Sequence, residues 1–231
     1  MSLKINETKK LFFNKFVYKL NLELGGICYL KRMSLSSIEK LEHFGTTYGY
    51  GRHTGQRDHA VKNKHKILAL GFFLEDCAQT HKFQSRAEGS TLGLYTNDIN
   101  FINKVKSEWA EIVSEVWQPS SSEAETFLRS NTRKIICNEL PKGRYRYKVH
   151  LAQRQIPTNI RVGFLNWASK YGDERLHLPY TTKKNLGEEG SGYFYGQYFY
   201  TSDDKILNMS LMFFSDYIQK TEHYVLKTEL S

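Results

Sequence analysis

Residues 144–151 combine four cation-capable side chains with an alternating pattern that is typical of a β-strand. Successive side chains of a strand point to opposite faces, so the four would stand in a row on one face, with tyrosine and aliphatic side chains on the other. Such a row suits the phosphate backbone of a nucleic acid. The alternative is an edge strand that uses charge to block pairing with other chains. The row consists of Arg144, Arg146, Lys148 and His150, and Lys142 and Arg154 extend it.

Two further sets of cations join the predicted nucleic-acid interface. Lys19 lies in an earlier strand whose sequence resembles that of residues 146–151. Residues 45–66 are rich in glycine and in positive charge, which predicts a flexible basic loop that leads into a helix. The cations of this region are Arg52, Arg57, Lys62, Lys64 and Lys66.

Asp98 and Asp203 each stand between an expected strand and an expected helix. A carboxylate in this place accepts hydrogen bonds from the first N–H groups of the helix, and a metal site is the alternative. The histidines at positions 53, 59 and 65 are spaced too widely to share one helix face at adjacent turns, and no cysteine joins them. We therefore expect no zinc site there.

His150 and Tyr180 resemble parts of the active site of HUH-type rolling-circle replication initiators. Members of that family hold a metal ion with paired histidines on a strand and carry a later nucleophilic tyrosine, in some cases followed by a lysine. His150 has no partner histidine in this sequence, whereas Tyr180 is followed by Lys184 at the expected spacing. The resemblance implies a DNA nickase with His150 and Tyr180 as catalytic residues and Mg²⁺ or Mn²⁺ as cofactor, but with an incomplete metal site.

Residues 69–77 resemble the helix of LAGLIDADG homing endonucleases, which ends in an acidic metal ligand and leads into strands that lie on DNA. Asp76 takes the acidic place, and Cys77 stands where glycine is usual. The segment 163–168 in the second half of the chain has no acidic counterpart. The resemblance implies a Mg²⁺- or Mn²⁺-dependent endonuclease with Asp76 as catalytic residue, whereas a protein that only binds nucleic acid needs no cofactor.

The elements that would position these residues recur in the two halves of the chain. Residues 17–22 and 146–151 share an order of aromatic, cationic and aliphatic residues, and residues 95–98 and 200–203 share a tyrosine, a threonine and an aspartate in order. We therefore predict an α+β fold of two similar strand-helix-strand-helix units, ferredoxin-like and duplicated within the chain. The first unit would span residues 1–118 with an insertion near 45–77, a linker would span 119–131, and the second unit would span 132–231.

Apolar spacing predicts the local structure at several places. Apolar residues three and four apart predict helices from Ile99 to Val116 and from Asp203 to Ile218. Residues 134–138 and 144–151 predict a hairpin around a turn at 140–143. Residues 27–31 are expected to pair with the strand that ends before Gly25.

The composition fits a partner of negative charge. Lys and Arg number 33 against 24 Asp and Glu, a net charge of +9, which favours nucleic acid over an acidic protein or an anionic membrane surface. Three widely separated cysteines argue against a disulfide framework and favour a reducing, intracellular compartment. No apolar run approaches the roughly 18–20 residues of a membrane span. The sequence thus predicts an intracellular protein that binds DNA or RNA, of viral or mobile-element origin in one interpretation. A nuclease or nickase, and a structural or assembly protein with a basic face, are the alternatives.

Overall fold

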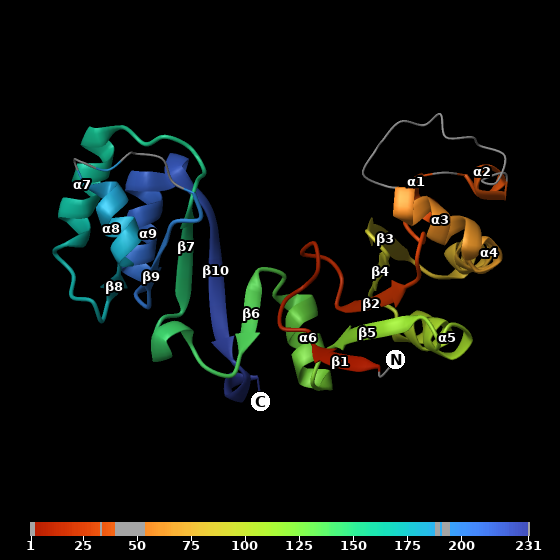
Figure 1. Ribbon diagram of the computed structural model, residues 1–231. Helices are drawn as coiled ribbons and strands as arrows, with labels where there is room; N and C mark the ends of the chain where they lie inside the picture. Colours follow the sequence, from red (N-terminus) through yellow and green to blue (C-terminus); the bar gives the residue numbers. More distant parts are fainter. Residues whose placement is uncertain (1–2, 33, 40–53, 188–189, 191–194, 231) are drawn as a thin grey trace. The chain divides into compact units, whose positions relative to one another are not determined.

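The computed structural model has an α+β fold and divides into two compact units, Met1–Thr132 and Arg133–Ser231 (Figure 1). The structure describes residues 3–32, 34–39, 54–187, 190 and 195–230. Each unit contains one five-stranded mixed sheet. Among the described helices, none combines the length and the apolar character that crossing a membrane requires.

The sheet of unit 1 has the strand order β1-β5-β2-β4-β3. β1 and β5 are parallel, and the remaining pairs are antiparallel. The strands are β1 (Lys4–Glu7), β2 (Tyr18–Glu23), β3 (Phe83–Glu88), β4 (Thr91–Thr96) and β5 (Val113–Gln118). Among the residues that the structure describes, four helices lie between β2 and β3, one joins β4 to β5, and one follows β5. They are α1 (Tyr29–Arg32), α2 (Leu35–Glu39), α3 (Thr54–Lys62), α4 (Lys64–Thr80), α5 (Ile99–Glu108) and α6 (Ser122–Ser130).

The sheet of unit 2 has the strand order β6-β10-β7-β9-β8, again with one parallel pair, β6 and β10, at its edge. The strands are β6 (Lys134–Cys137), β7 (Tyr147–Leu151), β8 (Leu176–His177), β9 (Tyr198–Thr201) and β10 (Ile218–Leu226). Helices separate β7 from β8, β8 from β9, and β9 from β10. They are α7 (Thr158–Ala168), α8 (Tyr180–Leu186) and α9 (Asp204–Phe214).

Each middle strand buries one face and leaves the other half-exposed. In β2, Leu20 and Leu22 are fully buried, and in β7, Val149 and Leu151 are buried. In unit 2 this face packs against all three helices, which Figure 1 shows on one side of β7 and β10. Because side chains alternate, the open face of each sheet presents a lysine, Lys19 in β2 and Lys148 in β7. We call these the two open faces.

The expected helix caps are confirmed. One carboxylate oxygen of Asp98 accepts the backbone N–H groups of Asn100 and Phe101, and the other lies 2.6 Å from His81 Nδ1. Asp203 likewise caps α9, and its second oxygen accepts from Arg175. Both carboxylates are thus used for helix capping and for a contact with an adjacent basic side chain.

The two predicted helices from Ile99 to Val116 and from Asp203 to Ile218 are too long. The first ends at Glu108 and the second at Phe214, and the chain then continues into β5 and β10. Apolar residues three and four apart continue by coincidence across each helix end. The strands that come last in chain order in the two units, β5 and β10, were therefore not predicted. The predicted hairpin of residues 134–138 and 144–151 is also wrong, because β10 lies between β6 and β7.

Residues 27–31 do not return as a strand, since Tyr29–Arg32 form α1. Gly25 and Gly26 before them allow a close approach of α3. Gly26 has φ of 85°, and a Cβ atom there would lie 2.4 Å from the Cα atom of Ala60. The glycine pair is therefore a packing site for a helix.

The insertion of unit 1 is helical where the structure describes it. Residues 54–66, expected as part of a flexible basic loop, lie in α3 and the start of α4, while residues 45–53 fall outside the described residues. Within the predicted linker 119–131, Ser122–Ser130 form α6. Tyr18 of β2 donates a 2.7 Å hydrogen bond to Glu125 of this helix, which ties α6 to the sheet of unit 1.

Candidate nucleic-acid interface

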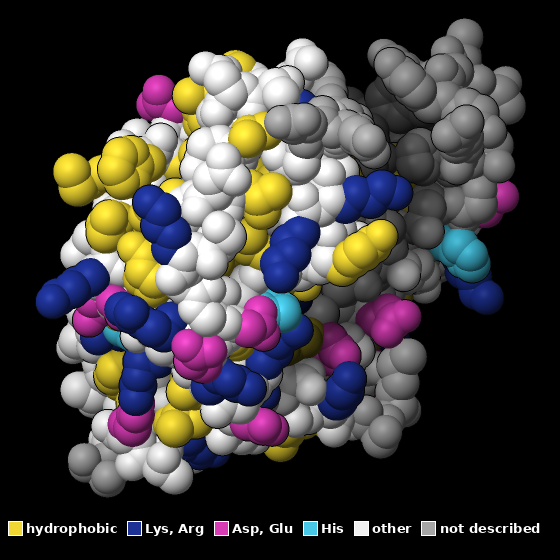
Figure 2. All heavy atoms as spheres, turned by 90° about the vertical axis from the view of Figure 1, so that its left-hand side faces the viewer, with side chains coloured by type: hydrophobic (Ala, Val, Ile, Leu, Met, Phe, Trp, Pro, Cys, Tyr) yellow, Lys and Arg dark blue, Asp and Glu magenta, His cyan; other side chains and the backbone are white. Residues whose placement is uncertain are grey.

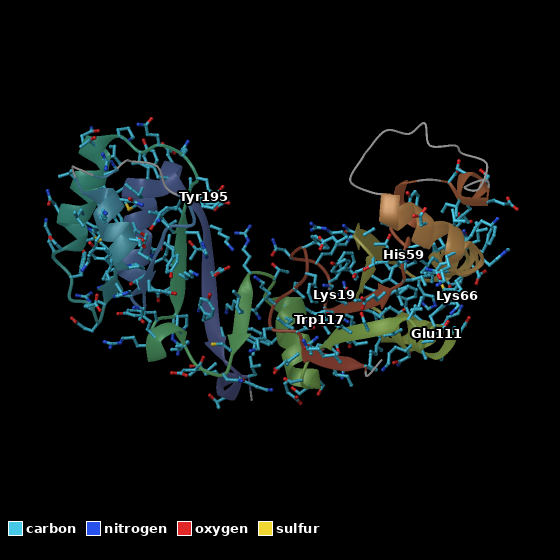
Figure 3. All side chains as sticks on the ribbon, in the orientation of Figure 1. Lys19, His59, Lys66, Glu111, Trp117 and Tyr195 are labelled. Carbon is cyan, nitrogen blue, oxygen red and sulfur yellow. The ribbon has the colours of Figure 1, made fainter. Side chains whose placement is uncertain are left out.

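Lys19 stands among aromatic rings on the open face of unit 1. Its Nζ atom lies 4.2 Å from the ring centroid of Trp117, and the rings of Tyr95 and Phe12 are 5.6 and 5.8 Å away. No described carboxylate forms an ion pair with it. Burial lowers the pKa of Lys19, and Glu115 opposes this effect. Figure 3 shows Lys19 and Trp117 next to each other and away from His59 and Lys66, which belong to the helices.

Phe13 adds an exposed ring to this face through a strained turn. Phe13 and Asn14 both have positive φ, 54° and 55°, and Lys15 N–H donates to Phe12 O at 3.0 Å. A left-handed conformation costs a residue such as phenylalanine about 1–2 kcal/mol. The turn holds the Phe13 ring 48% exposed, with its centroid 4.8 Å from that of Tyr95. Strain of this kind concentrates at functional sites, which makes Phe13 a candidate contact residue.

Lys148 occupies the same register position on the open face of unit 2. It pairs across strands with Tyr200, as Lys19 pairs with Tyr95. Its Nζ atom lies 4.0 Å from the ring centroid of Tyr198 and 5.9 Å from that of Tyr200. Glu222 is its cross-strand neighbour on β10 but pairs with His150 and Lys220, and no described carboxylate forms an ion pair with Lys148. Such cation–π contacts contribute about 0.5–1 kcal/mol and hold the ammonium in place.

The aromatic surface of this face continues toward β8. Tyr145 stacks on Tyr200 with ring centroids 5.6 Å apart, and His177 stacks on Tyr145 at 6.0 Å. Tyr145 is fixed because its hydroxyl donates to the carbonyl of Asp173. Tyr145 itself is buried and supports these rings from below. The open face of unit 2 therefore offers the half-exposed rings of Tyr198, Tyr200 and His177 beside a cation, which is a surface suited to stacked bases.

Glu222 of β10 organises the other side of the Lys148 site. Its carboxylate accepts hydrogen bonds from Lys220 at 2.7 Å and Tyr224 at 2.9 Å, and lies 3.0 Å from His150 Nε2. Burial raises the pKa of Glu222, but these donors outweigh burial and lower the pKa to about 2. Burial lowers the pKa of His150, against the effect of Glu222.

The lowered pKa of Glu222 predicts a pH-dependent stability. The carboxylate stabilises the fold fully above its ordinary pKa of 4.5, and this contribution is lost as the pH falls toward 2. Replacing Glu222 with glutamine should reduce the free energy of unfolding by about 1–2 kcal/mol at pH 7 and by less at pH 3. Urea unfolding at both pH values measures the difference. An equal loss at both would contradict the assignment of the charge.

The four cation-capable side chains predicted to form a row at residues 144–150 do not form a row of uncompensated charges. Arg146 forms a bidentate ion pair with Glu229, with N···O distances of 2.6 and 3.0 Å, and His150 is hydrogen-bonded to Glu222. The strand begins only at Tyr147, so the alternation does not reach back to Arg144. Tyr145 consequently packs against Tyr200 and is buried, whereas Tyr147 donates to Asp204 at the start of α9. Arg144 itself is exposed, 5.8 Å from the Tyr145 ring.

The other predicted contact residues are spread over unit 2 and the helices of unit 1. Lys142 Nζ lies 2.6 Å from His177 Nε2, beside the open face, and Arg154 lies 4.8 Å from the ring of Tyr217. Arg57, Lys62, Lys64 and Lys66 belong to α3 and α4, Lys66 pairs with Glu111 at 3.7 Å, and Arg52 falls outside the described residues.

The structure does not bring the predicted catalytic residues together. Tyr180 is 79% exposed at the start of α8, a helix on the buried side of the sheet, whereas His150 points to the open face. Asp76 is exposed within α4, which continues past it to Thr80, and its carboxylate lies 3.9 Å from Lys104. Within the described ranges, no group of three His, Cys, Asp or Glu side chains could hold a metal ion.

The helical side of unit 2 offers a different kind of surface. An apolar groove of about 260 Å³ lies between α7 and α9, lined mainly by Ile160, Phe164, Trp167 and Phe213. Figure 2 shows hydrophobic side chains exposed on this side. None of the groove residues is charged, so the groove provides no contact for a phosphate.

Sequence reasoning missed most of the aromatic part of the open faces. Phe13 stands in a turn, and Trp117 and Glu222 stand in β5 and β10, two strands that were not predicted. The alternating Tyr198 and Tyr200 carried a signal, because residues two apart in a strand share a face. We found no match to the chain among protein-family models, curated proteins or solved structures.

Proposed function

We propose that the protein binds single-stranded nucleic acid on its two open faces. The observation that supports this function best is the pair Lys19 and Lys148. Both lie on the middle strand of a sheet, at the same register position, over aromatic rings and without an ion pair to a described carboxylate. A lysine in this setting is left to pair with a phosphate, while the neighbouring rings can stack on bases.

We further propose that the two units are ferredoxin-like and arose by duplication within the chain. Without its parallel edge strand, each sheet reduces to four antiparallel strands with helical connections between the first and second and between the third and fourth. The shared strand order, the matched lysines and the matched caps at Asp98 and Asp203 support this interpretation. An open four-stranded sheet with aromatic side chains is a suitable surface for unpaired bases, which a double helix does not expose.

Replacing Lys19 and Lys148 with methionine should weaken binding while it retains the length of each side chain. Each lost phosphate contact with a single strand reduces the slope of log K against log salt concentration by about 0.7. At about 0.1 M salt, the loss of two contacts therefore lowers log K by about 1.4, which is a ~25-fold loss of affinity. Fluorescence anisotropy with labelled RNA and DNA oligonucleotides over a salt series measures both quantities.

The matched control removes two lysines from helices. Lys106 of α5 and Lys184 of α8 have no ion pair with a described residue, and their replacement by methionine changes the net charge equally. This control should keep nearly all of the affinity. Equal losses in the two double variants would show a non-specific charge effect and would contradict binding on the open faces.

A further inference from the structure

His150 has the arrangement of a general base on the open face of unit 2. Its Nε2 atom lies 3.0 Å from Glu222, whose low pKa keeps that carboxylate ionised and able only to accept. The neutral imidazole therefore carries its proton on Nε2 and has a lone pair on Nδ1. Nδ1 has no hydrogen-bond partner in the described part of the chain and is not among its fully buried polar atoms.

A cation and a stacking ring lie next to this base. Lys148 precedes His150 by two residues on the same face, which places their Cα atoms roughly 6.5–7 Å apart. The Lys148 ammonium lies 4.0 Å from the centroid of the Tyr198 ring, and the His150 ring lies 6.1 Å from it. The ribose and phosphate of a base stacked on Tyr198 would lie between the side chains of Lys148 and His150.

We propose that this cluster cleaves single-stranded RNA without a metal ion. The proposal rests on the proposed function, because the RNA must first bind to the open face. His150 Nδ1 takes the proton of a ribose 2′-hydroxyl, the 2′-oxygen forms a bond to the adjacent phosphorus, and the bond from phosphorus to the 5′-oxygen breaks. The 5′-oxygen takes a proton from water, and His150 later returns its proton to solvent. Lys148 stabilises the negative charge on the phosphoryl oxygens, and Glu222 acts as a positioning residue.

Unit 1 provides an internal comparison, since it retains the lysine and lacks the base. At the register positions of His150, Glu222 and Tyr198 it has Asn21, Trp117 and Gly93. An asparagine side chain does not accept a proton at neutral pH, so the open face of unit 1 would bind RNA without cleaving it. His150→Asn therefore introduces into unit 2 the residue that unit 1 already tolerates at this position.

The test uses the full chain, EDTA, and one RNA oligonucleotide in two forms, unmodified and fully 2′-O-methylated. The wild-type protein should cleave the first to ends with a 2′,3′-cyclic phosphate and a 5′-hydroxyl, and should bind the second without cleaving it. His150→Asn should lower the cleavage rate by about 10²–10⁴-fold and leave binding of the methylated RNA unchanged. Added imidazole should restore part of the activity of His150→Ala, which a structural role for His150 would not allow.

The pH profile separates the base from its positioning residue. The groups that face His150 are Glu222 and Lys220 on β10, Lys148 on β7 and Tyr198 on β9. The rate should rise with pH as His150 loses its proton. Because Glu222 raises the pKa of His150, Glu222→Gln should move this rise to lower pH as well as reduce the rate.

The outcomes distinguish this inference from the function on which it rests. Binding of the methylated RNA without cleavage of the unmodified RNA would overturn the cleavage proposal alone. The same holds for cleavage that EDTA abolishes, or for a His150→Asn protein that cleaves as fast as the wild type. Absence of binding to either RNA would overturn the proposed function and, with it, the cleavage.

Discussion

Replacing Phe13 and Tyr198 together with alanine should weaken binding of single-stranded nucleic acid by about 30-fold or more. Stacking of one base on an aromatic side chain contributes about 1–3 kcal/mol, so the loss of one stacked base on each open face costs at least about 2 kcal/mol. The expected loss is insensitive to salt, unlike the loss from Lys19 and Lys148, because no charge is removed. Anisotropy over a salt series therefore separates the two contributions.

The control variants either keep an aromatic ring at the two positions or remove a ring from another surface. Phe13→Tyr and Tyr198→Phe keep a flat ring and should keep the affinity within a few-fold. Tyr180→Ala removes a still more exposed ring from the helical side and should have no effect. Phe13 also tests the strain in its turn, since Phe13→Gly relieves the left-handed conformation while it removes the ring. Relief of strain should roughly offset the lost packing, so a large loss of affinity with little change in stability is expected. Full affinity of Phe13→Ala would contradict a contact role for this residue.

Replacing Arg161 with methionine should destabilise unit 2 by about 3 kcal/mol. Arg161 is 4% exposed on α7, and one of its guanidinium nitrogens donates to the carbonyl groups of Asn185, Gly187 and Gly190 at 2.7–3.0 Å. Asn185 lies in the last turn of α8, and Gly187 and Gly190 follow this helix and precede β9, which carries Tyr198 and Tyr200. Without this donor, the three carbonyl groups must bind water or stay without a hydrogen bond. Each carbonyl left unsatisfied costs about 1 kcal/mol or more of folding free energy.

Hydrogen–deuterium exchange measures this prediction unit by unit. Peptides from β7 and β9 should exchange faster in Arg161→Met, while peptides from β2 and β4 should be unaffected. Arg161→Lys retains a charge but lacks the planar group with several donors, so its effect should be intermediate. Unchanged exchange in β9 would show that the carbonyl groups find other partners.

The features that depend on residues close together in the chain, such as strand alternation and helix caps, could be predicted from the sequence. The alternation of β2 and β7 placed Lys19 and Lys148 on faces opposite to buried aliphatic residues, and Asp98 and Asp203 cap helices as expected. Both depend on interactions between residues close in the chain. The α+β class could be predicted for the same reason.

The remaining features depend on partners far apart in the chain. Glu222 reaches His150 across 72 residues, and Arg146 reaches Glu229 across 83, so no local pattern shows that the charges of residues 144–150 are compensated. The helix predicted from Ile99 extended into β5 because three- and four-residue spacing cannot be told apart from alternation over so few residues. Of β10, only Ile218 lay within a predicted element. Because these strands were not predicted, the sequence did not reveal Trp117 as the aromatic neighbour of Lys19 or Glu222 as the acidic neighbour of Lys148.

Photo-cross-linking of a single-stranded RNA that contains 4-thiouridine, followed by mass spectrometry, tests the central claim most directly. If nucleic acid binds to the open faces, cross-links should fall on the peptides that carry Phe13, Tyr198 and Tyr200, and should disappear with excess unlabelled single strand. Cross-links confined to α3 and α4, or to the groove between α7 and α9, would contradict the account.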